Sequence, residues 1–89
     1  MTTIKGNEFM TLNITGGTEY SVSFKGAGRV NILNCTDDDL IISRGDFSDT
    51  SACLTIPQNM GYDGLRLNCD GSLYFKASTD GKVIITGVK

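Results

Sequence analysis

The side chains most able to do chemistry are five carboxylates in one short stretch. Asp37, Asp38 and Asp39 are adjacent, and Asp46 and Asp49 follow them closely. Calcium takes several oxygen ligands at flexible spacing, but this stretch lacks the glycine that an EF-hand loop has at its sixth position. Adjacent acidic residues also occur in solvated turns that keep strand ends from pairing with other chains. We therefore predict a solvated acidic loop without a dedicated metal site, and a calcium site at these carboxylates is the alternative.

Catalysis has little support elsewhere in the chain. There is no histidine, which removes the commonest general base and the commonest metal ligand. The serines and threonines form no nucleophile-elbow motif. Gly26-Ala27-Gly28 is followed by strand-like alternation, whereas a phosphate-binding loop needs a helix after it. We predict that the protein is not an enzyme and has no catalytic residues and no cofactor.

The cysteines Cys35, Cys53 and Cys69 are odd in number and include no Cys-x-x-Cys pair. Without histidine, this spacing does not suit a zinc site. Cys69 shares its alternation phase with Leu65 and Leu67, as a small buried hydrophobic residue does. We predict three reduced and mostly buried thiols.

Apolar and polar residues alternate with a period of two along most of the 89 residues, which is typical of β-strands. No window combines helical spacing with a helix cap. Eleven glycines and a single proline indicate many tight turns. The pattern predicts about eight short strands, at residues 10–15, 20–25, 30–32, 40–43, 54–56, 65–68, 72–77 and 82–88.

Asp-Gly pairs separate the last segments, at Asp63-Gly64, Asp70-Gly71 and Asp80-Gly81. This pair is favoured in two-residue hairpins because both central positions need positive φ. We therefore predict a C-terminal meander. The strand lengths and spacing predict a single all-β domain over residues 1–89, an antiparallel β-sandwich of jelly-roll type.

The overall charge and the short apolar runs argue against two classes of partner. The formal net charge is -2, which does not suit a generic binder of nucleic acid or anionic membranes. The longest apolar runs, such as residues 40–42 and 83–85, are too short for a transmembrane segment or a signal peptide. We expect no nucleic-acid partner and no membrane association.

A chain of this size buries only about three-fifths of the surface that it exposes when unfolded. No tryptophan is present, no disulfide or metal is expected, and few predicted strands carry residues that protect a sheet edge. We therefore predict a homo-oligomer, with a trimer favoured. The candidate interface residues are apolar residues outside the main phase or exposed tyrosines: Ile4, Phe9, Met60, Tyr62 and Tyr74.

Residues 28–88 contain a series of short motifs in strand order. The series reads apolar-Asn, Asp-apolar-apolar-Ser, apolar-Pro and Tyr-Asp-Gly, and it ends in a valine-rich strand; its segments are residues 30–34, 39–43, 54–57, 62–66, 73–77 and 81–83. This order resembles the small all-β virion proteins of tailed bacteriophages. The resemblance implies a symmetric oligomer without enzymatic activity that contacts other virion proteins. It also implies a location in the virion, or in the host cytoplasm before assembly.

The function predicted from these observations is that of a non-enzymatic structural or binding module. We expect a phage or prophage virion component, such as a head-decoration, fibre or tail-associated protein, that acts through protein–protein contacts. The alternative is a small carbohydrate-binding β-sandwich module, which would need a shallow face lined by aromatic residues.

Overall fold

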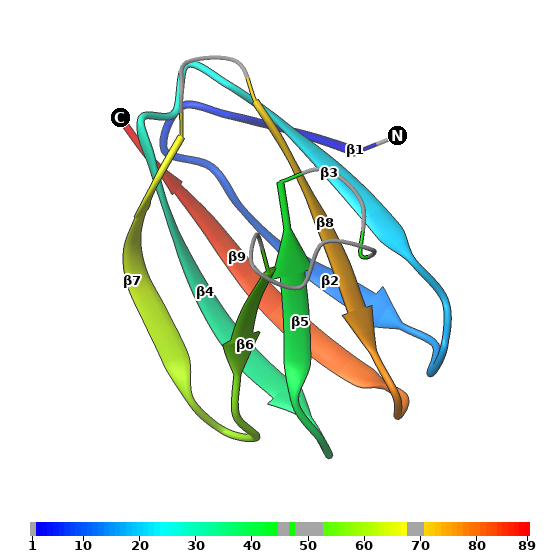
Figure 1. The fold of residues 1–89 in the computed structure, drawn as a ribbon. Coiled ribbons are helices and arrows are strands. Elements are labelled where there is room, and N and C mark those ends of the chain that lie inside the picture. Colours follow the sequence, from blue (N-terminus) through cyan, green and yellow to red (C-terminus); the bar gives the residue numbers. More distant parts are fainter. Residues whose placement is uncertain (1, 45–46, 48–52, 68–70) are drawn as a thin grey trace.

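Every regular element in the described part of the chain is a β-strand (Figure 1). The structure is a computed structural model and describes residues 2–44, 47, 53–67 and 71–89. One sheet contains, in order, β1 (Thr2–Lys5), β3 (Tyr20–Lys25), β8 (Ser72–Ala77), β5 (Leu40–Ser43) and β6 (Cys53–Ile56). The other contains β2 (Phe9–Ile14), β9 (Gly81–Val88), β4 (Arg29–Thr36) and β7 (Gly61–Arg66).

The strand order confirms the predicted jelly-roll sandwich. Strands β2-β9-β4-β7 and β3-β8-β5-β6 follow the two-sheet order of a jelly roll, and β1 is an additional strand beside β3. All neighbouring strands run antiparallel except β1 and β3, which are parallel. Consecutive strands alternate between the sheets except β5 and β6, which form a hairpin.

The core lies between the sheets because each strand places alternate residues on its inner side. In β4 the buried residues are Val30, Ile32, Asn34 and Thr36, and in β9 they are at positions 83, 85 and 87. The largest buried side chains are those of Phe24 in β3 and Phe75 in β8.

The predicted C-terminal meander is wrong. β7 and β9 belong to the four-stranded sheet, where β4 separates them, and β8 belongs to the other sheet. Asp63-Gly64 lies inside β7 and is a β-bulge instead of a turn, and Asp80-Gly81 lies at a crossover between the sheets. Asp70 of the third pair lies outside the described residues.

Two glycines show what the Asp-Gly pairs provide. Gly64 has a φ of 75°, which a bulge can require and which side chains other than glycine rarely adopt. A Cβ on Gly81 would lie 2.6 Å from the Cα of Thr36, so close packing of β9 against β4 excludes a side chain there. Glycine in an Asp-Gly pair therefore allows a positive φ at Gly64 and close strand packing at Gly81, and neither glycine lies in a hairpin turn.

Candidate functional site

The five predicted interface residues fall into three environments. Phe9, Met60 and Tyr62 are exposed, with 77%, 56% and 41% of their surface accessible. Tyr74 is half-buried on the outer side of the five-stranded sheet. Ile4 is buried in the core, so its assignment to an interface is wrong: β1 pairs with β3 and turns this side chain inward beside Phe24.

The exposed three lie at opposite edges of the four-stranded sheet. Phe9 is the first residue of β2, which is one edge strand. Tyr62 lies in β7, the other edge strand, and Met60 directly precedes that strand. Each edge of this sheet therefore combines a large exposed apolar side chain with a strand that has a neighbour on only one side.

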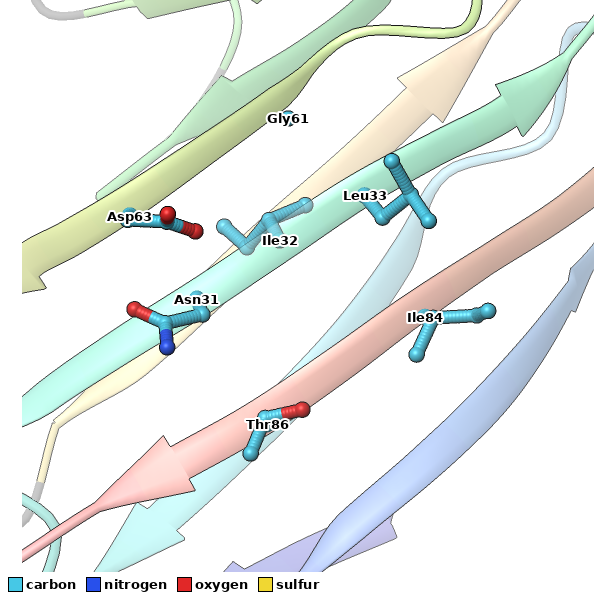
Figure 2. A pocket seen from close by; sticks show the side chains of 7 residues that line it. All are labelled: Asn31, Ile32, Leu33, Gly61, Asp63, Ile84 and Thr86. Atoms are coloured by element: carbon cyan, nitrogen blue, oxygen red, sulfur yellow. The ribbon is translucent and has the colours of Figure 1, made fainter.

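The outer face of the same sheet carries two further exposed apolar residues. Leu33 of β4 and Ile84 of β9 are cross-strand partners, with 40% and 37% of their surface accessible. Beside them lies a depression of about 300 Å³ (Figure 2). Its lining combines these two side chains with polar groups of three strands: Asn31, Ile32, Leu33, Gly61, Asp63, Ile84 and Thr86.

A β-bulge shapes one side of this depression. Between the pairs Val30–Leu65 and Ile32–Tyr62, the single residue Asn31 lies opposite two residues, Asp63 and Gly64. The backbone N–H of Gly64 donates to the Asn31 side-chain oxygen over 2.8 Å. Figure 2 shows the Asp63 side chain reaching from β7 toward β4. Bulges re-aim side chains in this way next to functional sites.

The acidic stretch forms no metal centre among the described residues. Asp37, Asp38 and Asp39 are exposed, and Asp46 and Asp49 lie outside the described part of the chain. The Ser78 hydroxyl donates to Asp38, as does the Asp39 N–H, and these hydrogen bonds hold the pKa of the Asp38 carboxyl below its usual value. Asp38 thereby joins the β4–β5 crossover to the β8–β9 crossover.

The cysteine prediction is wrong for Cys35. This thiol is exposed on the outer side of β4, because its neighbours Asn34 and Thr36 take the inward positions of the strand. Cys53 is half-buried, and Cys69 lies outside the described residues.

A buried polar cluster explains this inverted phase. The Asn34 amide nitrogen donates to the carbonyls of Asp38 and Ile56 over 2.8 and 2.9 Å, and its oxygen accepts from the backbone N–H and hydroxyl of Thr36 over 2.9 and 2.7 Å. Asn34 thus ties β4 to the end of β6 in the facing sheet. The alternation of apolar and polar residues does not predict that Asn34 is buried, because a polar residue in a strand is normally assigned to the exposed side.

No known protein family, curated protein or solved structure matches this chain. The described residues also contain no helix long and apolar enough to cross a membrane.

Proposed function

We propose that this chain is a non-enzymatic structural module that assembles with copies of itself through the two edges of its four-stranded sheet. The observation that carries this proposal is the position of Phe9 at one edge and of Met60 and Tyr62 at the other. These three are the most exposed of the large apolar side chains in the described residues.

Both edges gain from being covered. Burying an exposed phenylalanine side chain contributes about 2 kcal/mol. An edge strand also presents unpaired N–H and C=O groups, which a second strand can satisfy. The Phe9 edge differs from the Met60 edge, so a contact between them is head-to-tail, and such contacts form a ring when the rotation from one copy to the next closes. A trimer is the ring we propose.

The wider role we propose is that of a phage or prophage virion component. It rests on the resemblance of the motif series to virion proteins and on the jelly-roll strand order, an architecture that viral capsid domains use. Neighbouring genes for capsid, portal or tail proteins would support this role, and a genome without them would count against it.

Light scattering after size-exclusion chromatography tests the assembly. The native chain should have the mass of a trimer, and Phe9→Ser and Met60→Ser should each have that of a monomer. Mixing the two variants should produce a dimer, because the intact Met60 edge of one can still bind the intact Phe9 edge of the other. Leu33→Ser, on the face between the edges, is the control and should remain trimeric. A native chain that stays monomeric at high concentration contradicts the proposal.

A further inference from the structure

We infer that the depression on the outer face of the four-stranded sheet is a binding site for a neutral carbohydrate. It lies on the outer side of β4, β7 and β9 (Figure 2), so one of its walls belongs to β7, a strand whose free edge is proposed for assembly. The inference is argued from the depression itself and does not depend on assembly.

The bulge leaves polar groups free to meet a ligand. The Asn31 oxygen is occupied by the Gly64 N–H, which leaves its amide nitrogen to donate, and Figure 2 shows that nitrogen on the side of β9. No hydrogen bond or ion pair within the described residues occupies the exposed Asp63 carboxylate. Thr86 lies opposite Asn31 on β9 and adds a hydroxyl that can donate or accept.

The polar groups of Asn31 and Asp63 determine which ligand charge the depression favours. The Asp63 carboxylate disfavours an anion, and an ammonium ion, which has no acceptor, would leave the N–H groups of the Asn31 amide without a partner. A ligand with several hydroxyl groups suits the site, because each hydroxyl can donate to Asp63 and accept from Asn31. The polar groups therefore favour a neutral polyol.

The apolar residues favour a ring-shaped polyol. Leu33 and Ile84 provide a wall for the C–H face of a sugar ring. Gly61 lies opposite Leu33, and its missing side chain leaves the depression open. The volume is at the lower end of the range for small-molecule sites, which suits a single sugar ring.

Amide NMR spectra of the full chain test the site. The probes are methyl glycosides of glucose, galactose, mannose and N-acetylglucosamine, each titrated to about 50 mM, since a shallow open site should bind with a Kd on the order of 1–10 mM. At least one glycoside should produce saturable shifts at Asn31, Gly64 and Thr86. Butylammonium, as a cationic probe, should produce none.

Two variants and a control locate the binding. Thr86→Val keeps the side-chain shape, removes the hydroxyl and should weaken binding about three- to tenfold. Gly61→Leu should fill the depression and abolish binding. Thr55→Val, on the outer side of β6, should bind like the native chain. Saturable shifts by no glycoside, shifts by butylammonium instead, or undiminished binding by Thr86→Val overturns the proposal.

The experiments can contradict the assembly proposal without contradicting the carbohydrate site, and the reverse. Met60→Ser should still bind the glycoside whether or not it is monomeric, and Thr86→Val should keep the native mass. A chain that binds sugar as a monomer would therefore overturn the assembly alone.

Discussion

The two outer faces of the sandwich differ although the same alternation produces both. On the five-stranded sheet the outward residues of β3 and β8 are half-buried except Lys25, and Ser23 and Ser72 share a hydrogen bond of 3.1 Å. The Lys76 ammonium also lies 5.7 Å from the centre of the Phe47 ring. On the four-stranded sheet, Leu33 and Ile84 are exposed at the centre of the face.

This difference shows that the inward residues of a strand determine the core, whereas its outward residues determine which surface is left for a partner. Inward residues of both sheets are apolar and specify the core, so they look alike in the sequence. On the five-stranded sheet the outward residues Ser23, Ser72 and Lys76 contact residues of their own chain, whereas on the four-stranded sheet Leu33 and Ile84 are exposed. Function is therefore expected on the second face and stability on the first.

Removing the Asn34 side chain, which links β4 to the facing sheet, should have the largest effect on stability. Asn34→Ala should lower the free energy of unfolding by about 3 kcal/mol, because it leaves the carbonyls of Asp38, in the β4–β5 crossover, and of Ile56, at the end of β6 in the facing sheet, without this donor. Urea unfolding measures this loss. Asn31→Ala, on the outer side of the same strand, is the matched control and should lose about 1 kcal/mol. Equal losses would show that the inner and outer asparagines are equivalent.

The second prediction compares one aromatic residue from each sheet. Tyr74→Ser should lower the free energy of unfolding by about 2 kcal/mol, because the Tyr74 ring is half-buried within its own chain. Phe9→Ser should change it by less than about 0.5 kcal/mol, because most of the ring is exposed. Both are measured by urea unfolding at a concentration where the chain is monomeric. A larger loss for Phe9→Ser would reverse the assignment of the two faces.

Most strands could be predicted from the sequence, because apolar alternation and strand formation have the same period. The predicted strands at 40–43 and 72–77 match β5 and β8 residue for residue. β1 was missed because it has one inward apolar residue, Ile4, and therefore shows no alternation. β7 begins four residues before the predicted segment at 65–68, because its bulge interrupts the phase at Gly64.

The candidate site was harder to predict than the fold. Phe9 and Met60 were expected to be exposed because they fall outside the apolar phase, and they are. The depression was not foreseen, because Asn31, Asp63 and Thr86 are far apart in the sequence and meet only through the pairing of β4 with β7 and β9. The Asp63-Gly64 pair is its one local signal in the sequence, and this pair predicts a turn.

The third prediction concerns the bulge that distinguishes the four-stranded face. Gly64→Ala should lower the free energy of unfolding by about 1 kcal/mol, because alanine is strained at a φ of 75°. Gly28→Ala is the control: a Cβ there meets nothing within 4 Å and its φ is not positive, so its stability should be nearly native. Chemical shifts of Asn31 report whether the bulge survives. An unchanged stability for Gly64→Ala would mean that the bulge adapts without strain.

The smallest expected effect is a pH dependence of stability that comes from Asp38, where the β4–β5 and β8–β9 crossovers meet. The Ser78 hydroxyl, and after it the Asp39 N–H, holds the pKa of Asp38 below its usual value. A carboxyl whose pKa is lowered in the folded state stabilises that state at pH values above its ordinary pKa. That contribution disappears as the pH falls through the lowered value.

Ser78→Ala removes the main hydrogen bond and should move the pKa of Asp38 back toward the ordinary range of aspartate. Carboxyl-carbon NMR titration of Asp38 measures the midpoint. The native chain should be slightly more stable than Ser78→Ala at pH 6, and the part of this difference that comes from Asp38 ionisation should vanish below the lowered pKa. Ser23→Ala is the control, because the Ser23 hydroxyl pairs with Ser72 and should leave the midpoint unchanged. An Asp38 midpoint that is the same in the native chain and Ser78→Ala would show that this hydrogen bond does not link the two crossovers in solution.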